Sequence, residues 1–325
     1  MLVLRITTTT AYSLARRLYS SNAPVPLVIS PVDYPHLAGS VIPVDVSWHM
    51  PGSGRDPRAE FFKGKRIPRA RFLDLDKAAS SHPLNLPHMM PSETLFAQTC
   101  RSLDINKDSH VVLYDTLGVF SSPRALFMFK AFGHEKASVL NGGLRFWESG
   151  GFPLEDSDHA LQIEPSDYPE PTLNASTLRT YEQIVENSKQ PLSASRGVEL
   201  VLDARAAPRY HGTAPEPRPG LPSGHIPHSI SLPFNALLES HTFGSNTFTT
   251  IREPDDLRKI IVDILGSDEA LQPRAARRIV NTCGSGMTAA IIWLALQRLG
   301  VDSALYDESW MGYAGRSESE IVTSK

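Results

Sequence analysis

The stretch that decides the fold runs from residue 278 to residue 296: Arg-Ile-Val-Asn-Thr-Cys-Gly-Ser-Gly-Met-Thr-Ala-Ala-Ile-Ile-Trp-Leu-Ala-Leu. Residues 278–282 predict a buried strand, and the apolar run 289–296 predicts a buried helix. Cys283 therefore lies where a strand ends and a helix begins, in a tight loop with two glycines. Unpaired N–H groups of the first helical turn and the helix dipole stabilise an anion at such a place. The loop predicts a nucleophilic cysteine rather than one buried for packing.

Two other kinds of cysteine chemistry fit the loop poorly. Tyrosine-type phosphatases also place a cysteine between a strand and a helix, but they need an arginine six positions later, where this chain has Ala289. Papain-like proteases carry a local signature around the cysteine that is missing here. The second cysteine, Cys100, has no glycine-rich loop around it and is expected to be inert in a helix core.

The composition indicates a globular protein with two domains. The 325 residues, of which 41% are hydrophobic and 21% charged, exceed the usual size of a single hydrophobic core. A net charge of −3 gives no sign of a nucleic-acid-binding surface. Two cysteines and eleven scattered histidines give no ligand pattern, so we expect no metal or other cofactor. No apolar run approaches the ~20 residues of a membrane span. We therefore expect a soluble protein from a reducing compartment.

Residues 1–22 are typical of a mitochondrial transit peptide. They contain Arg5, Arg16 and Arg17, many hydroxyl side chains, and no Asp or Glu. Basic, Ser-rich and acid-free segments have this targeting role. We therefore expect a mitochondrial protein and exclude this segment from the fold. Two alternatives remain open: that residues 1–22 are a tail without a targeting signal, and that the protein has an additional cytoplasmic pool.

From residue 25 to residue 150, short apolar runs alternate with longer amphipathic ones. Strands are predicted at 41–45, 110–115 and 137–140, and a helix at 123–132. This alternation predicts the α/β class, with a mostly parallel sheet covered by helices on both faces. Residues 151–173, rich in Pro, Asp and Ser, are interpreted as an interdomain linker.

The first pattern returns in a second domain, which we take to span residues 174–325. The matched segments are 44–48 with 202–205, 66–70 with 225–229, and 112–115 with 280–283. Gly133 and Gly300 then follow at matching distances. The chain reads as a tandem duplication in which Asp115 stands in the place of Cys283. Because an aspartate cannot act as a thiol nucleophile, we expect the first domain to be catalytically silent and to cover the site of the second.

The loop sequence Cys-Gly-Ser-Gly-x-Thr at 283–288 resembles the active-site loop of the rhodanese superfamily. Its particular residues resemble those of the 3-mercaptopyruvate sulfurtransferases. Three further tracts carry the resemblance: 203–205 (Asp-Ala-Arg), 209–218 (Arg-Tyr-His-Gly-Thr-Ala-Pro-Glu-Pro-Arg) and 224–227 (Gly-His-Ile-Pro). It covers roughly residues 25–315 and implies two tandem rhodanese-like domains. The sequence of these tracts is most similar to that of the fungal members linked to wobble-uridine thiolation of tRNA.

The resemblance implies that Cys283 takes sulfur from 3-mercaptopyruvate, releases pyruvate, and passes the persulfide sulfur to thiol acceptors such as thioredoxin. Arg209 and Arg218 match the family's substrate-binding arginines, whose planar forks suit a carboxylate. The backbone N–H groups that follow the cysteine are expected to hold the anionic sulfur, and they belong to Gly284, Ser285, Gly286, Met287 and Thr288. Met287 stands where the family usually has a smaller aliphatic residue.

Ser285, His88 and Asp76 match a Ser–His–Asp arrangement that relays a proton in the animal mercaptopyruvate sulfurtransferases. The residues around His88 differ from the commonest sequence of the family. The alternative is therefore that His88 forms only a structural hydrogen bond. A relay also needs a geometry that sequence does not contain. Four further side chains are expected to be structural: Asp203 bracing the cysteine loop, His225 fixing a turn, and Arg124 and Arg205 in ion pairs.

Two other functions remain as alternatives. A thiosulfate:cyanide sulfurtransferase is disfavoured by the neutral pair Gly284-Ser285, because a dianionic donor gains from positive charge at these positions. A persulfide relay protein would stand between a cysteine desulfurase and a tRNA-thiolation activating enzyme, with no direct contact to nucleic acid or membrane. The sequence does not decide the sulfur acceptor or the oligomeric state.

Overall fold

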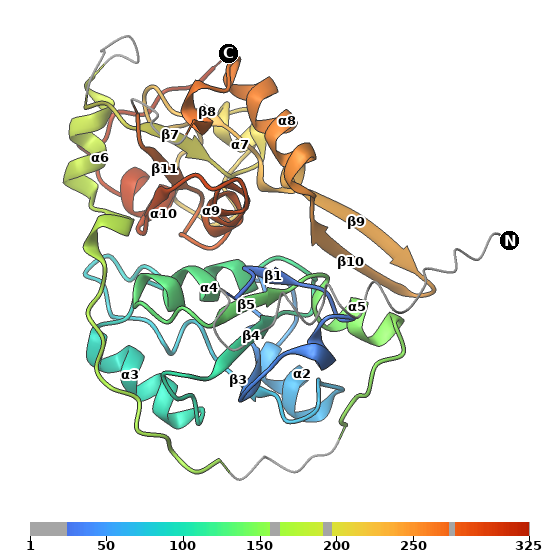
Figure 1. Ribbon diagram of the computed structural model, residues 1–325. Coiled ribbons are helices and arrows are strands. Elements are labelled where there is room, and N and C mark those ends of the chain that lie inside the picture. Colours follow the sequence, from blue (N-terminus) through green and yellow to red (C-terminus); the bar gives the residue numbers. More distant parts are fainter. Residues whose placement is uncertain (1–24, 157–162, 191–196, 273–276, 325) are drawn as a thin grey trace, which may run out of the picture.

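The computed structural model describes residues 25–156, 163–190, 197–272 and 277–324. The transit peptide predicted at residues 1–22 lies outside this part of the chain. Figure 1 shows two α/β units stacked on one another, the N-terminal unit below and the C-terminal unit above.

The two units contain a similar series of helices and strands. The first unit comprises β1 (Val28–Ile29), η1 (Tyr34–His36), β2 (Val41–Asp45), α2 (Pro57–Lys63), β3 (Arg71–Phe72), α3 (Glu93–Ser102), β4 (His110–Tyr114), α4 (Ser122–Ala131), β5 (Ala137–Leu140) and α5 (Gly143–Ser149). The second comprises η2 (Ala175–Thr177), β6 (Leu178–Arg179), α6 (Tyr181–Ser188), β7 (Leu200–Asp203), α7 (Ala207–Tyr210), β8 (Ile230–Ser231), η3 (Phe234–Leu237), β9 (Leu238–Phe243), β10 (Asn246–Ile251), α8 (Pro254–Leu265), η4 (Glu269–Leu271), β11 (Ile279–Thr282), α9 (Ala289–Arg298), β12 (Ser303–Tyr306) and α10 (Ser309–Ala314).

Both units are built on five parallel strands in the same order. The first sheet runs β1-β5-β4-β2-β3 and the second runs β6-β12-β11-β7-β8. Matching β4 to β11 turns one order into the other, which confirms the duplication that the sequence predicts. Asp115 and Cys283 consequently lie at the same point of the two sheets, directly after the central strand.

The predicted strands and helices around this point agree with the structure to within one or two residues. β2 and β5 have the predicted bounds, β4 ends one residue before Asp115, and β11 begins at Ile279 rather than Arg278. The patterns work because the central strands β4 and β11 are buried along their whole length, as expected for a parallel sheet with both faces covered. The α/β class and its mostly parallel sheets are confirmed.

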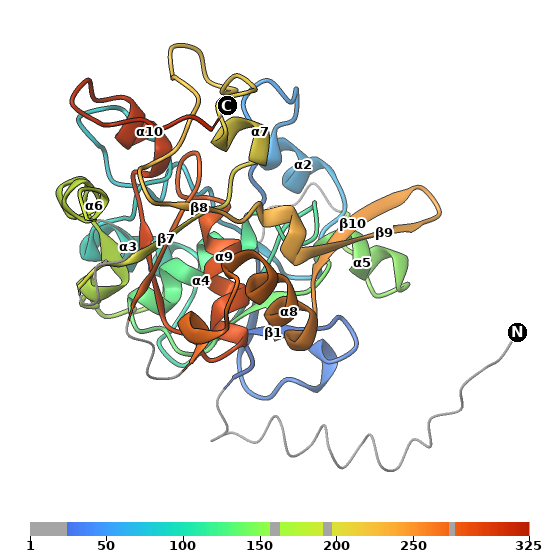
Figure 2. The same cartoon turned by 90° about the horizontal axis from the view of Figure 1, so that it is seen from above.

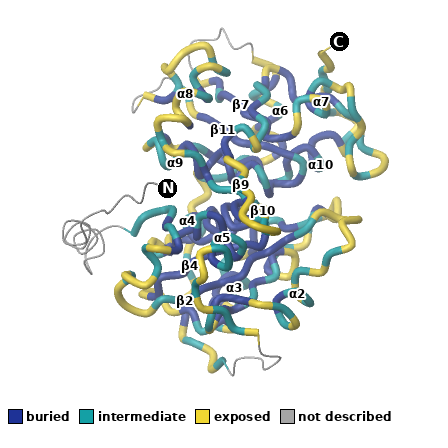
Figure 3. Tube along the Cα trace, turned by 90° about the vertical axis from the view of Figure 1, so that its right-hand side faces the viewer, coloured by how far each residue is buried: buried dark blue, intermediate teal, exposed yellow. Residues whose placement is uncertain are grey.

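Helices α4 and α9 pack against each other between the two sheets (Figures 1 and 2). Both are buried over nearly their whole length, and the ring of Phe127 meets the ring of Trp293 edge-on at 5.2 Å. A helix that is apolar all round needs a partner besides its own sheet. One hydrophobic core therefore runs through both units, and Figure 3 shows dark, buried chain on both sides of their interface. This places the loops after β4 and β11 close to the interface.

The antiparallel hairpin of β9 and β10 was not predicted. It extends from the second unit alongside α5 of the first (Figure 1). The Thr249 N–H donates to the Leu117 carbonyl at 3.0 Å, and the Phe248 ring stacks on Phe146 at 5.1 Å. The hairpin segments are rich in polar residues, and an isolated hairpin is marginally stable. Contact with the other unit, which sequence periodicity does not report, stabilises it.

The segment interpreted as a linker, 151–173, contains no helix or strand among its described residues. Its carbonyl and N–H at Glu155 pair with Arg66, and Tyr168 is fully buried beside His134. The segment therefore packs along the first unit before the chain enters the second.

Candidate active site

The Cys283 loop turns sharply between β11 and α9. The Gly286 N–H donates to Cys283 Sγ at 3.2 Å, and the Cys283 N–H donates to Ser309 Oγ at 3.2 Å. The Trp310 N–H donates to the Cys283 carbonyl at 2.9 Å. Cys283 is only 1% exposed. The thiol thus lies buried near the interface between the units. Contacts from the first residues of α10 fix the conformation of its loop.

Gly286 and Gly284 allow other groups to approach this loop. Gly286 has φ +85°, and a Cβ at this residue would lie 2.8 Å from the Asp307 carbonyl oxygen, so another residue would be both strained and obstructed. A Cβ at Gly284 would lie 3.2 Å from the Arg209 guanidinium. Met287 is buried, and Thr288 is half-buried at the start of α9. The two glycines therefore bring Asp307 and an arginine against the cysteine loop.

The first unit brings His88 to the same loop. His88 Nε2 lies 2.8 Å from Ser285 Oγ, and His88 Nδ1 lies 2.9 Å from Asp76 Oδ1. Trp48 Nε1 donates to the other carboxylate oxygen of Asp76 at 2.9 Å, and its ring meets the His88 ring edge-on. The structure thus brings the three matched residues together across the domain interface. Their roles stay a proposal.

The environment of this chain favours a neutral imidazole and an ionised carboxylate. Burial lowers the pKa of His88 more than its hydrogen bond to Asp76 raises it, and the charges of Arg124 and Arg218 act with burial. Burial raises the pKa of Asp76, but the hydrogen bonds from His88 and Trp48, together with the charge of Arg218, outweigh it, so this pKa lies below its usual value. A neutral His88 that donates Nδ1–H to Asp76 can accept a proton from Ser285 at Nε2.

Arg209 and Arg218 belong to the second unit and lie near the cysteine loop. Arg209 forms a hydrogen-bonded ion pair with Glu216, whose other oxygen accepts from Arg205 at 2.9 Å. Burial lowers the pKa of Arg218, and the charge of Cys283 opposes this shift. Both arginines are partly exposed, so they can meet an anion that enters beside the sulfur.

The prediction that Asp203 braces the cysteine loop is wrong. Its carboxylate binds Arg205 instead, through the backbone N–H at 2.9 Å and the guanidinium at 2.6 Å. The predicted ion pairs of Arg205 and Arg124 are confirmed, and His225 does fix a turn, by its ring contact with the Tyr210 carbonyl. Cys100 is buried within α3, and burial raises its pKa strongly. Its thiol is therefore suited to packing, as expected.

Sequence reasoning missed Glu216, Asp307 and Trp48. Glu216 could have been found, because it is an acidic residue between two arginines in an otherwise uncharged, Pro-rich tract. Asp307 and Trp48 reach the site from distant parts of the chain, and no local pattern marks them. Both became visible only through their contacts with Met90 and Asp76.

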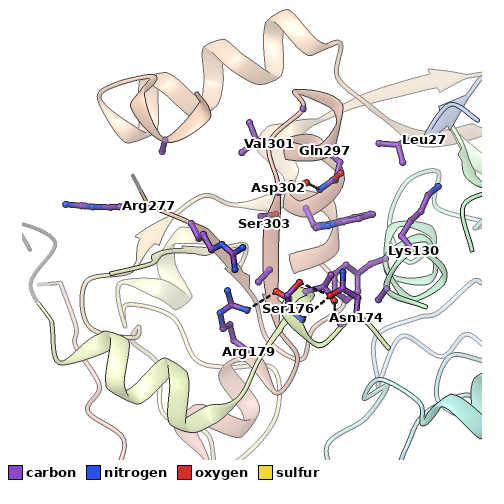
Figure 4. A pocket seen from close by; sticks show the side chains of 18 of the residues that line it. Leu27, Lys130, Asn174, Ser176, Arg179, Arg277, Gln297, Val301, Asp302 and Ser303 are labelled. Carbon is purple, nitrogen blue, oxygen red and sulfur yellow. Dashed lines mark hydrogen bonds between the residues drawn. The ribbon is translucent and has the colours of Figure 1, made fainter. Parts of the chain in front are cut away.

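A cavity of about 600 Å³ also opens between the units, but it lies at the opposite edge of the second sheet (Figure 4). Its lining includes Arg278 and Ser303, which stand where β11 and β12 begin, whereas Cys283 follows the end of β11. The cavity is therefore separate from the cysteine site. Among the described residues, no cluster of His, Cys, Asp and Glu could hold a metal ion. No helix in the same part of the chain is long and apolar enough to cross a membrane.

Comparison with known proteins agrees with this geometry. The family model of the rhodanese-like domain matches residues 44–149 and again residues 185–316. The chain belongs to the rhodanese-like family. Each match covers one of the two parallel sheets except its edge strand, β1 or β6, and the first residues of β2.

Curated relatives of this rhodanese-like protein are sulfurtransferases with two named donors. The chain is 36% identical to 3-mercaptopyruvate sulfurtransferase of Rattus norvegicus over 87% of its own length and 88% of the relative's. It is 38% identical to thiosulfate sulfurtransferase of Bos taurus, with 89% and 91% covered. A relative from Arabidopsis thaliana, "Thiosulfate/3-mercaptopyruvate sulfurtransferase 1, mitochondrial", is 35% identical, with 86% and 73% covered. The chain is therefore a member of a sulfur-transferring family.

Among solved structures, the Tum1 protein of Saccharomyces cerevisiae superimposes with a TM-score of 0.80 at 28% identity. The match covers 93% of this chain and all of that one. The two-unit arrangement is thus shared with a yeast protein.

Proposed function

We propose that this rhodanese-like protein takes sulfur from 3-mercaptopyruvate onto Cys283 and releases pyruvate. The observation that carries the proposal is the chain from Ser285 Oγ to His88 to Asp76, which reaches the cysteine loop from the other unit. A donor whose leaving group is a carbanion equivalent needs a proton at that point, and a serine backed by a neutral histidine can relay the proton of the donor's own thiol.

The reaction balances as a displacement at sulfur. The Cys283 thiolate attacks the thiol sulfur of mercaptopyruvate, an S–S bond forms, and the C–S bond breaks with its electrons moving into the pyruvate enolate. The thiol proton passes through Ser285 to His88 and returns by the same path to the enolate carbon. The persulfide stays anionic, and the N–H groups of the loop, with Gly286 already on Sγ, stabilise it.

Arg209 and Arg218 act in this proposal as the clamp for the donor's carboxylate and ketone. Glu216 holds the Arg209 guanidinium in one orientation, so less side-chain entropy is lost when the donor binds. The guanidinium lies against Gly284, next to the nucleophile. Binding through these forks places the thiol sulfur of the donor at Cys283.

The deciding experiment is the intact mass of the purified protein after incubation with 3-mercaptopyruvate and, separately, with thiosulfate. The proposal expects a gain of one sulfur atom, on Cys283, with mercaptopyruvate preferred. Cys283→Ser is the control, because it keeps the loop but removes the thiolate. No gain from mercaptopyruvate would overturn the donor assignment.

Thiosulfate is the second candidate donor, favoured by the 38% identity to the bovine thiosulfate sulfurtransferase. A dianionic donor gains from positive charge, which the arginines supply beside the loop but the neutral Gly284-Ser285 pair does not supply within it. Sulfur gained from thiosulfate alone would move the protein to this second function.

We also propose that the persulfide sulfur goes on to a protein thiol, in a relay that includes thioredoxin or a tRNA-thiolation activating enzyme. The support is the similarity of the sequence to fungal members linked to wobble-uridine thiolation, and the overall likeness to yeast Tum1. Because Cys283 is 1% exposed, a protein thiol reaches it only when the groups that cover the sulfur move. Transfer of labelled sulfur to a purified acceptor, with a free thiol such as cysteine as the control, tests the relay. Loading of Cys283 by a cysteine desulfurase alone would identify an upstream protein donor.

The proposed location is the mitochondrion, because residues 1–22 are basic and acid-free and a plant relative is named as mitochondrial. Import of a fluorescent fusion with and without these residues tests it. Import that survives the deletion would contradict the assignment.

A further inference from the structure

Arg124 is a buried cation between the two units that no step of the proposed reaction uses. It lies in the first turn of α4 and is 2% exposed. Its Nη2 donates to the His88 carbonyl at 2.7 Å and to Asp307 Oδ1 at 2.6 Å. The other carboxylate oxygen of Asp307 accepts from the Met90 N–H at 2.7 Å. This Arg124–Asp307 pair therefore contacts two peptide units within residues 88–90, which we call the His88 segment.

The His88 segment needs such a hold. The backbone of His88 has φ +41°, close to the left-handed region that non-glycine residues seldom adopt. A strained residue keeps its conformation only when its surroundings fix it. The contacts to the His88 carbonyl and the Met90 N–H fix the peptides on either side of residue 89. They thereby set the direction of the imidazole that lies 2.8 Å from Ser285.

The same pair also contacts the cysteine loop. Asp307 follows β12, and its carbonyl oxygen closely approaches Gly286. Nη1 of Arg124 lies 3.3 Å from the position of a Cβ on Gly286, and it has no hydrogen-bond partner among the described residues although it is buried. The guanidinium thus adds positive charge beside the loop that carries the anionic sulfur.

We propose that Arg124 is a positioning residue through which the silent unit assembles the proton path: it locks the His88 backbone and the Asp307 carboxylate together, and so aligns the imidazole with Ser285. The inference rests on the proposed function of the Ser285–His88–Asp76 chain. Arginine suits this position because the two N–H bonds of one nitrogen serve both acceptors within a rigid plane, whereas the lysine ammonium is a freely rotating point charge.

The charge of Arg124 adds a measurable signature. The charged groups that face His88 are Asp76 on the same loop, Arg124 on α4 and Arg218 on the loop after α7, and the two arginines favour the neutral imidazole. Removing the guanidinium therefore raises the pKa of His88 and moves the acid limb of the activity profile to higher pH. Loss of a purely structural ion pair elsewhere leaves this limb unchanged.

The experiment compares Arg124→Gln, Arg124→Lys and His88→Gln in 3-mercaptopyruvate turnover across pH. Arg66→Gln is the matched control, because Arg66 is equally buried, pairs with Glu155 at 2.8 Å and lies in the same unit. We expect Arg124→Gln to lower kcat roughly 10- to 100-fold with little change in KM. Its acid limb should move up by roughly one pH unit or less. Arg124→Lys, which keeps the charge, should hold the limb in place while kcat recovers only in part.

Each outcome separates the two proposals. If His88→Gln is impaired while Arg124→Gln keeps the original kcat and pH profile, the role of Arg124 is overturned and the proton path stands. If His88→Gln turns over normally, the proton path fails, and the role of Arg124 fails with it. Should Arg124→Gln not fold, the double variant Arg124→Gln/Asp307→Asn removes both charges together and is held to the same criteria.

Discussion

The loops after β4 and β11 occupy equivalent positions, yet the first is filled by its own carboxylate and the second is not. In the first unit, the Asp115 carboxylate accepts six hydrogen bonds between 2.8 and 3.1 Å. The donors are the N–H groups of Leu117, Gly118, Phe120, Ser121 and Ser122 and the hydroxyl of Ser122. In the second, Cys283 Sγ accepts a single backbone hydrogen bond among the described residues, from Gly286. The first unit thus fills this loop with its own carboxylate where, in our proposal, the second unit holds an anionic sulfur.

Each loop is also covered by the opposite unit. The hairpin of β9 and β10 lies on the Asp115 loop, where Thr249 contacts Leu117 and closely approaches Gly118. The His88 segment lies on the Cys283 loop. The first cover is a two-stranded sheet held by backbone bonds, and the second is an irregular segment held by side chains. The difference teaches that the Asp115 loop is held together by its own carboxylate, whereas the Cys283 loop takes its contacts from α10 and from the other unit.

The largest expected effect is the loss of sulfur transfer in Cys283→Ser, by at least about 10³-fold, because the nucleophile itself is removed. Sulfur loading followed by intact mass measures it. The sharper variant is the double change Cys283→Ser/Asp115→Cys. We expect no sulfur at residue 115, because the proposed proton path and the two proposed donor-binding arginines lie at the Cys283 loop. Sulfur found there would mean that the loop alone is sufficient.

Next in size is the effect of Asp115→Ala on stability. It leaves several buried donors without an acceptor and should cost about 3–5 kcal/mol in the free energy of unfolding. Urea denaturation measures this. Asp108→Ala is the control, because the Asp108 side chain is 96% exposed and its loss should change stability by about 0.5 kcal/mol or less. Equal stability of the two variants would contradict the view of Asp115 as a built-in anion.

Smaller effects are expected at the proposed donor clamp. Arg209→Ala and Arg218→Ala should each raise the KM for 3-mercaptopyruvate roughly 10- to 150-fold, since each removes a charge-assisted contact of about 1.5–3 kcal/mol. Steady-state kinetics measures the change, with Arg258→Ala, an exposed arginine on α8, as the control. An unchanged KM in both variants would remove the clamp from the mechanism.

Measured per pH unit, the smallest effect concerns Asp45 and Asp203, the equivalent aspartates at the ends of β2 and β7. Asp203 pairs with Arg205, whereas Asp45 has Ser47 at that place, and burial raises the pKa of Asp45 to about 7. Because this pKa is above its unfolded value, the protonated form stabilises the fold at low pH, and that stability is lost as pH rises toward 7.

Asp45→Asn should therefore stabilise the protein relative to the native chain by an amount that grows between pH 4 and 7, by up to about 1.4 kcal/mol per pH unit, and then stays constant. Urea titrations at pH 5 and pH 8 check it. A stability difference that does not change with pH would show that Asp45 is already ionised in the acid range.

Much of the site was readable from the sequence because it depends on local patterns. The strand, loop and helix around Cys283 follow from apolar periodicity and two glycines, and the duplication follows from repeated segments. The role expected for Asp203 was wrong because a neighbour two residues away, Arg205, competes for its carboxylate. The hairpin was missed because its polar strands are stabilised by contacts far away in sequence. Neither competition nor long-range contact leaves a periodic signal.

The sequence by itself determined the two parallel sheets, the cysteine at the end of a central strand, and the aspartate at the equivalent point, because buried strands and tight turns constrain residue types locally. Tertiary structure alone decided that His88 meets Ser285, 197 residues away, and that Arg124 joins His88 to Asp307. These contacts exist because two apolar helices, α4 and α9, must bury their outer faces against each other. That packing places the site between the units.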